Sequence, residues 1–153
     1  MIVVSDTSAI TSLMQVGCAR LLRDLHGSVI IPTAVHAELL RTHAATPAFV
    51  EVREVQERMR VDELGADLDL GEAEAIVLAK ELNADLLIID EKLGRQVALR
   101  EGLRISGLMG LVVEAKQRGL IPSVRELVHR LEVEAGFRVS DIVKAEAFRL
   151  AHE

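Results

Sequence analysis

The sequence predicts an α/β fold in which a mostly parallel central sheet is flanked by helices. Short apolar segments alternate with longer segments of helical periodicity. The apolar segments are continuous, which is typical of strands buried on both faces of a parallel sheet. Half of the 153 residues are hydrophobic, and most of these are aliphatic, with three Phe and no Trp or Tyr. Strands separated by helices indicate βαβ units.

Four apolar segments are expected to form the strands. They are Ile2–Val4, Val29–Ile31, Asp85–Asp90 and Leu103–Ile105. The third is the clearest, because a continuous apolar run that is closed by an acid suits the centre of a parallel sheet.

Helices are expected between and after these strands, with small polar residues, Pro and Gly at their ends. The expected helices are Ser8–Val16, Cys18–Leu25, Pro32–Arg41, Thr46–Met59, Glu72–Leu82, Lys92–Arg100, Gly107–Arg118, Ser123–Glu134 and Ser140–His152. The length suits one domain over residues 1–153, with its C-terminal helices from about 120 to 153.

The composition disfavours several classes of protein. A formal charge of −6 is not the basic footprint of a simple nucleic-acid-binding module. A single cysteine, Cys18, excludes an internal disulfide and a cysteine-based zinc site. The run Met1–Val4 is too short for a secretory signal, and no apolar stretch reaches the roughly 18–20 residues of a membrane helix. We therefore expect a reduced, cytoplasmic setting without a membrane.

Two acids follow predicted strands. Asp6 comes after Ile2–Val4, and Asp90 closes the Asp85–Asp90 segment. In open α/β sheets, ligands bind beyond the carboxyl ends of the strands. If both strands are central and parallel, the two carboxylates lie at the same edge. The alternative is that each Asp only caps the helix that follows it.

Two glutamates lie near apolar helix faces. Helical spacing places Glu38 beside Val35, and it places Glu72 on the same stripe as Ile76. A carboxylate near an apolar face is unfavourable unless a cation or a donor meets it. The alternatives are that Glu38 is an exposed residue paired with Arg41, and that Glu72 is a favourable acid in a first helical turn.

Four carboxylates that converge would repel one another strongly. Mg²⁺ or Mn²⁺ would relieve this repulsion, because hard divalent cations prefer oxygen ligands. A bound ion of this kind can activate water and stabilise charge on a phosphate, and it needs no side-chain nucleophile. The acids therefore favour phosphodiester hydrolysis.

These residues resemble the motifs of PIN domains. The matching segments are Asp6-Thr7-Ser8, Glu38, Gly71-Glu72-Ala73-Glu74-Ala75-Ile76 and Ile88-Ile89-Asp90. The sequence resembles most closely a prokaryotic PIN-like branch that is catalogued as a domain of unknown function. The segments Ile89–Arg95 and Gly119–Ser123 carry that closer resemblance, which covers nearly the whole chain.

The resemblance implies a Rossmann-like PIN fold and a Mg²⁺- or Mn²⁺-dependent endoribonuclease. It implies that Asp6, Glu38, Glu72 and Asp90 are both the catalytic and the metal-binding residues. Ser8, Glu91 and Arg95 are implied as supporting residues: Ser8 by hydrogen bonding to the acids, and Arg95 as a phosphate or carboxylate partner near Asp90. Many relatives are toxins of type II toxin–antitoxin pairs, so a small antitoxin and a homodimer are also implied.

The sequence departs from the common PIN pattern at two motifs. Glu72 stands where Asp is usual, and no aromatic residue follows Asp90. Aromatic side chains usually stack on the bases of single-stranded RNA. With three Phe, the chain is expected to grip RNA mainly through its backbone or its shape.

Two other functions remain open from the residues. A phosphatase of the haloacid-dehalogenase type also has Asp after its first strand, but it needs a second Asp where this chain has Ser8. A non-catalytic or weakly active binding protein that acts with a partner would fit the negative charge. The apolar stripe of Val124, Leu127, Val128 and Leu131 is interpreted as core, or else as a partner surface.

Overall fold

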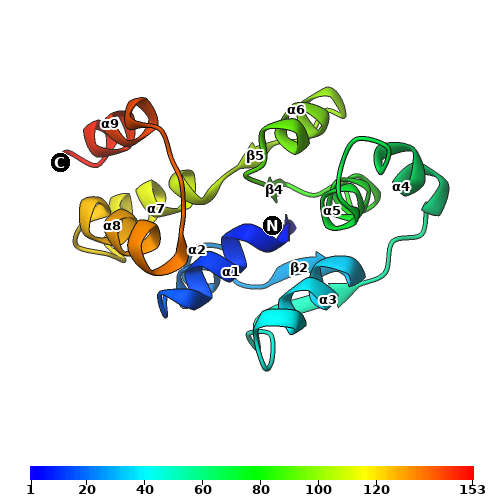
Figure 1. Cartoon of the computed structure of the whole chain (residues 1–153), viewed down its shortest axis with the longest axis horizontal. Helices are drawn as coiled ribbons and strands as arrows, with labels where there is room; N and C mark the ends of the chain where they lie inside the picture. Colours follow the sequence, from blue (N-terminus) through cyan, green and yellow to red (C-terminus); the bar gives the residue numbers. More distant parts are fainter.

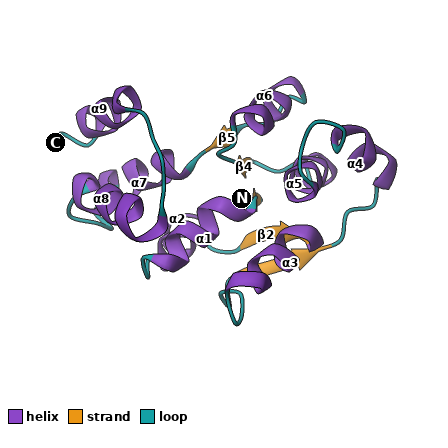
Figure 2. Ribbon diagram, viewed as in Figure 1, coloured by secondary structure: helices purple, strands orange, loops and turns teal.

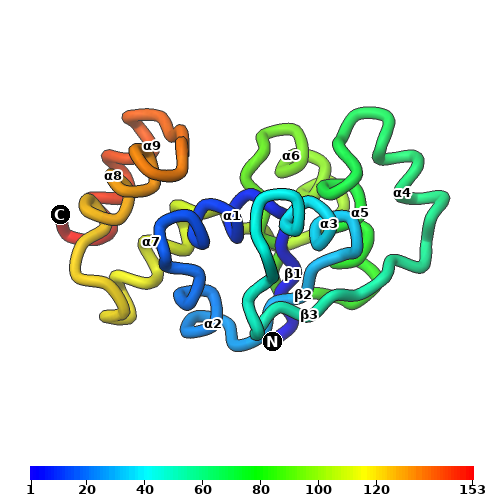
Figure 3. The backbone as a smooth tube through the Cα atoms, turned by 60° about the horizontal axis from the view of Figure 1, so that its bottom comes forward, coloured from blue at the N-terminus to red at the C-terminus, as the bar shows by residue number.

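The computed structural model describes residues 1–153 and has one sheet of five parallel strands. The strand order is β3-β2-β1-β4-β5. The strands are β1 (Val3–Ser5), β2 (Val29–Pro32), β3 (Val50–Arg53), β4 (Leu86–Ile88) and β5 (Ile105–Ser106). Figure 3 shows β1, β2 and β3 side by side. The predicted α/β class and parallel sheet are confirmed.

Helices cover both faces of this sheet. They are α1 (Thr7–Gln15), α2 (Arg20–His26), α3 (Thr33–Thr42), α4 (Arg58–Leu64), α5 (Leu70–Glu81), α6 (Lys92–Arg100), α7 (Leu108–Gln117), α8 (Val124–Ala135) and α9 (Asp141–Leu150). Figure 1 shows α7, α8 and α9 at one end of the molecule and α4 at the other end. None of the helices has the length and apolar content needed to cross a membrane.

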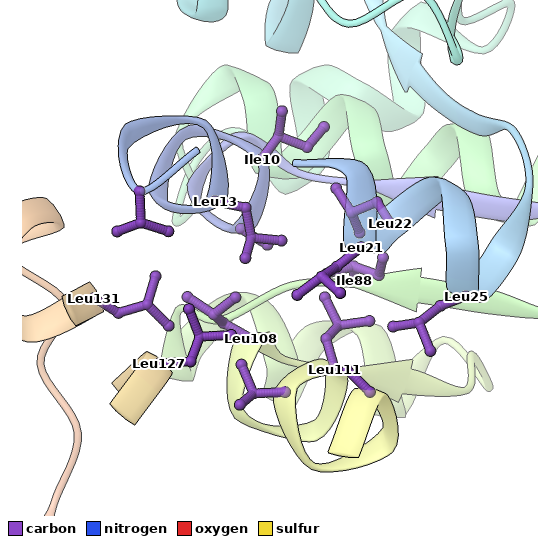
Figure 4. Packing of buried hydrophobic residues seen from close by; sticks show 14 of the residues in the cluster. Ile10, Leu13, Leu21, Leu22, Leu25, Ile88, Leu108, Leu111, Leu127 and Leu131 are labelled. Atoms are coloured by element: carbon purple, nitrogen blue, oxygen red, sulfur yellow. The ribbon is translucent and has the colours of Figure 1, made fainter. Parts of the chain in front are cut away.

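Two apolar cores lie on opposite faces of the sheet. Successive strand residues point to opposite faces, so Val3 packs into one core and Val4 into the other. Figure 4 shows the first core, where leucines of α2, α7 and α8 meet Ile10 and Leu13 of α1 around Ile88. The second core lies under α5 and α6. The alternating packing holds the strand ends in fixed register.

One predicted helix, Thr46–Met59, is wrong. Its centre is the edge strand β3, which pairs in parallel with β2 from Val50 to Arg53, and helix begins again only at Arg58. Val50 and Val52 are β-branched residues, which favour strands, and pairing with β2 outweighs the local helical pattern. The other predicted elements differ from the structure by at most two residues at either end.

Glu74 satisfies backbone groups at the start of a helix. It is buried on α5, accepts a hydrogen bond from the backbone N–H of Ala34 at 3.0 Å, and pairs with Arg58 at 2.7 Å. Glu74 therefore ties the starts of α3 and α4 to α5. A carboxylate at a helix N-terminus meets both unpaired N–H groups and the positive end of the helix dipole.

Glu153 plays the same part for α8. Its carboxylate accepts hydrogen bonds from the Val124 N–H at 2.6 Å and from the Ser123 hydroxyl at 2.9 Å, and it pairs with Lys116 at 3.2 Å. These donors, with the Val124 backbone bond as the largest cause, lower the pKa of Glu153 from 4.5 to about 2. The charge of Glu153 therefore stabilises the C-terminal helices.

We expect Glu153→Gln to lower stability in a pH-dependent way. A lowered pKa in the folded state stabilises the fold above the unfolded-state pKa, and this contribution disappears as the pH falls from about 4.5 towards 2. The difference in urea midpoint between the wild type and Glu153→Gln should thus be largest at pH 7 and narrow below pH 4.5. A difference that stays constant over this range would contradict the capping role.

Candidate functional site

Parallel strand pairing brings Asp6 and Asp90 to the same edge of the sheet. β1 and β4 are adjacent and parallel, and Ser5 pairs with Ile88. The Asp6 backbone N–H donates to the Ile88 carbonyl at 2.9 Å. Asp6 follows β1 directly and Asp90 lies two residues after β4, so their carboxylates emerge at the carboxyl edge, where ligands of α/β sheets bind.

Glu38 of α3 meets Asp6 across a glycine. A Cβ added to Gly71 would overlap Glu38 Oε1 and would lie 3.5 Å from Asp6 Oδ1. The bare Cα of Gly71 therefore lets the two carboxylates approach. The Thr7 hydroxyl donates to Glu38 Oε2 at 2.6 Å, which fixes that side chain towards the start of α1. Glu38 does not pair with Arg41, so the exposed alternative is not what the structure shows.

Glu72 is buried, with 6% of its surface exposed, and its two carboxylate oxygens differ. Oε1 accepts weakly from the Asp69 N–H at 3.4 Å, while Asp69 accepts from the Glu72 N–H at 2.8 Å. This reciprocal pair is a capping box at the start of α5. Oε2 is buried without any partner. It lies against Gly94, where an added Cβ would come within 2.8 Å.

Asp90 lies at the start of α7. It accepts a hydrogen bond from the Leu108 backbone N–H at 3.0 Å. A Cβ on Gly107 would come within 2.5 Å of Asp90 Oδ1 and 2.9 Å of Arg95 Nη1. Arg95 donates to the Ile89 carbonyl at 2.8 Å, which holds the guanidinium beside Asp90. Asp90 thus caps α7 rather than α6, and Asp6 makes no side-chain capping bond to α1.

Burial and mutual repulsion shift the acids towards their protonated forms. Burial raises the pKa of Asp6 from 3.8 to about 7, with added repulsion from Asp69, Glu38 and Asp90, against the opposing backbone bond from Thr7. Burial also raises the pKa of Glu72 from 4.5 to about 8, and Asp69 and Asp6 add to the rise. The pKa of Asp90 is raised by burial and opposed by the Leu108 N–H and by Arg95.

Two residues of the site, Asp69 and Thr7, were not identified from the sequence, and the contact expected of Ser8 is made by Thr7 instead. Asp69 joins the acids, and its spacing of three residues before Glu72 is the capping-box pattern that could have revealed it. Thr7, not Ser8, supplies the hydroxyl bonded to an acid. The Ser8 side chain instead lines a groove beside Asp90, because the first turn of α1 directs it away from Glu38. Glu91 is the exposed N-cap residue of α6 and lines the same groove.

The donor set fits a hard divalent cation, although the side chains do not form a closed ligand shell. No three carboxylate, imidazole or thiol groups stand as ligands of one ion. The donors are all carboxylate oxygens, which Mg²⁺ and Mn²⁺ prefer. Glu72 Oε2 is buried without a protein donor, and at Asp6 burial and repulsion outweigh the one backbone bond from Thr7.

We expect Asp6→Asn to stabilise the metal-free protein at high pH. A raised pKa in the folded state costs stability as the pH rises from about 4 through about 7. Asn removes that cost, which is at least about 1 kcal/mol, and should raise Tm by roughly 2–4 °C for a domain of this size.

The measurement is thermal unfolding in EDTA at pH 8 and at pH 4.5, with the exposed Asp62→Asn of α4 as the control. The rise in Tm of Asp6→Asn over the wild type should appear at pH 8, shrink at pH 4.5 and be absent from Asp62→Asn. If Asp6→Asn lowered Tm equally at both pH values, ionised Asp6 would not be destabilised by burial and repulsion in the folded protein.

Comparison with known families assigns the chain. A family model described as a PIN domain, within a family of unknown function, matches residues 2–153. No curated protein matches the chain significantly. PIN domains are generally nucleases, which agrees with acids clustered at the carboxyl edge of a parallel sheet. The match disfavours the haloacid-dehalogenase-type phosphatase that the residues alone had left open. Because the family model spans nearly every residue, the chain belongs to the PIN-domain family.

Proposed function

We propose that this PIN domain is a metal-dependent endoribonuclease. The observation that carries the proposal is the burial of Asp6 among the like-charged Glu38, Asp69 and Asp90, which raises its pKa to about 7. Folding gains nothing from such a cluster by itself. A binding site for a cation, on the other hand, requires uncompensated carboxylates in a confined place.

Asp6, Glu38, Glu72 and Asp90 would hold Mg²⁺ or Mn²⁺. When bound, the ion would supply an activated water and stabilise charge on the scissile phosphate. Binding would displace the protons that Asp6 and Glu72 hold near neutral pH, because metal ligands must be deprotonated. Glu72 replaces the more usual Asp; one oxygen of its longer side chain is in the capping box, and the other, Oε2, lies without a partner against Gly94.

The remaining residues orient these acids and the substrate. Thr7 holds Glu38 through its hydroxyl, and the Asp69 backbone holds Glu72. Arg95, held by the Ile89 carbonyl, would contact a phosphate oxygen next to Asp90. A guanidinium suits this task because its planar donors match phosphate oxygens.

The partners implied by the resemblance are proposed on separate grounds. α9 exposes Ile142 and Val143, and with α7 it borders an apolar groove of about 390 Å³. Exposed apolar surface of this kind supports an interface. A second copy of the chain would form a homodimer there, and a small antitoxin would make the domain the toxin of a type II pair.

A second candidate function is that of a weakly active or non-catalytic binding protein. This function is favoured because two of the acids accept hydrogen bonds from backbone N–H groups at helix starts: Asp90 caps α7, and Glu72 is part of the capping box of α5. Acids held in this way already serve the fold, so their positions do not require a metal.

Cleavage of RNA separates these two functions. We expect the wild type to cleave single-stranded RNA in Mn²⁺, to stop in EDTA and to resume when Mn²⁺ is restored. Asp6→Asn and Glu38→Gln should each lose about 100-fold or more in rate, which corresponds to about 3 kcal/mol or more of lost transition-state stabilisation. Cleavage is read from end-labelled RNA on a denaturing gel.

Asp62→Asn, on the exposed face of α4, is the matched control and should cleave like the wild type. The double variant Asp6→Ala, Asp90→Ala should be inactive. If it cleaves as fast as the wild type, the activity comes from a contaminant and the nuclease proposal fails.

A further inference from the structure

The largest groove of the molecule adjoins the acids. It has a volume of about 790 Å³ and runs from Asp90 and Ser8 to the connection between α8 and α9. Figure 2 shows this connection as a loop, and it covers residues 136–140. The volume lies in the range of small-ligand sites, so the groove can take a few nucleotides of an extended strand but not a duplex.

The two arginines of this groove differ in their partners, because Arg95 lies beside Asp90 whereas Arg138 has no carboxylate partner. Most arginines of the chain form ion pairs within 4.0 Å, including Arg130 of α8 with Glu134 and Arg149 of α9 with Glu146. Arg138 lies between these two and forms no ion pair or hydrogen bond, and Arg95 bonds only to a backbone carbonyl. A guanidinium without any partner, in the same groove as a second arginine, indicates a site for an anion in this acidic protein.

The rest of the lining suits a nucleic-acid strand. Ser8 and Ser12 of α1 offer hydroxyl groups on one wall. Phe137 and Met109 offer an apolar wall, and Phe137 is the one Phe of the chain that reaches this groove. Phe137, an aromatic residue distant in sequence, thus lines the same groove as Asp90, whose own motif carries no aromatic residue. Bases contact aromatic and apolar walls, while phosphates contact arginines and hydroxyl groups.

We propose that this groove binds the RNA strand next to the cleaved bond, and that Arg138 positions it by contacting a backbone phosphate. The inference rests on the proposed nuclease function, since the strand would pass from the groove to the acids at Asp90. Arg138 lies on the connection between α8 and α9 and forms no ion pair with the acids, so it is a positioning residue. It explains how a protein of charge −6 can hold a polyanion.

The test measures binding without cleavage. A labelled single-stranded RNA of about ten nucleotides is titrated in EDTA at several salt concentrations, and affinity is read by fluorescence anisotropy. We expect Arg138→Ala to bind more weakly, with a slope of log affinity against log salt that is smaller by about 0.7, the value for one phosphate contact on a single strand. Arg138→Lys should keep the slope, because it keeps the charge.

Arg100→Ala is the matched control. Arg100 ends α6, is exposed, forms no ion pair and does not line the groove. Arg100→Ala removes the same charge as Arg138→Ala. Because Arg100 lies outside the groove, RNA affinity and the salt slope should stay at their wild-type values. Equal effects of the two alanine variants, or an Arg138→Ala variant that binds like the wild type, would overturn the proposal. Unchanged Tm in Arg138→Ala confirms that the fold is intact.

The outcomes also separate this inference from the nuclease proposal. If binding depends on Arg138 but the wild type does not cleave RNA in Mn²⁺, the groove proposal is supported and the nuclease proposal is wrong. If the wild type cleaves RNA but Arg138→Ala matches it in both affinity and KM, the groove proposal alone is lost.

Discussion

Repulsion between buried carboxylates is the constraint around which this site is built. Parallel pairing of β1 with β4 brings Asp6 and Asp90 to one edge, and the first turn of α5 adds Asp69 and Glu72. Burial of these groups together raises the pKa of Asp6 to about 7 and that of Glu72 to about 8. The fold tolerates this because two extensive apolar cores hold both faces of the sheet.

Glycines make the convergence sterically feasible. Gly71 faces Glu38 and Asp6, Gly94 faces Glu72, and Gly107 faces Asp90 and Arg95. At each position an added Cβ would collide with a carboxylate oxygen. These glycines are not needed for left-handed backbone, since none of them has positive φ. Their common feature is close approach of the backbone to an acid.

Much of the fold and part of the site could be predicted from the sequence. Continuous apolar runs ending in Asp6 and Asp90 fix both the strands and the edge where the acids meet. The edge strand β3 was not predicted, because the β-branched Val50 and Val52 are a weak local signal and the deciding contact is the long-range pairing with β2. The groove could not be predicted either, because Arg138 and Phe137 come to line the same groove as Asp90 only when α8 packs on α1.

The central claim is that these acids bind one or more divalent cations. Anomalous scattering from crystals soaked in Mn²⁺ tests it most directly, with Asp6→Asn crystals as the control. The account predicts a Mn²⁺ peak in contact with Asp6 and with carboxylates of Glu38, Glu72 or Asp90, and loss of that peak in the variant. A well-diffracting soaked crystal without a peak at the carboxyl edge, or a peak that persists unchanged in Asp6→Asn, would contradict it.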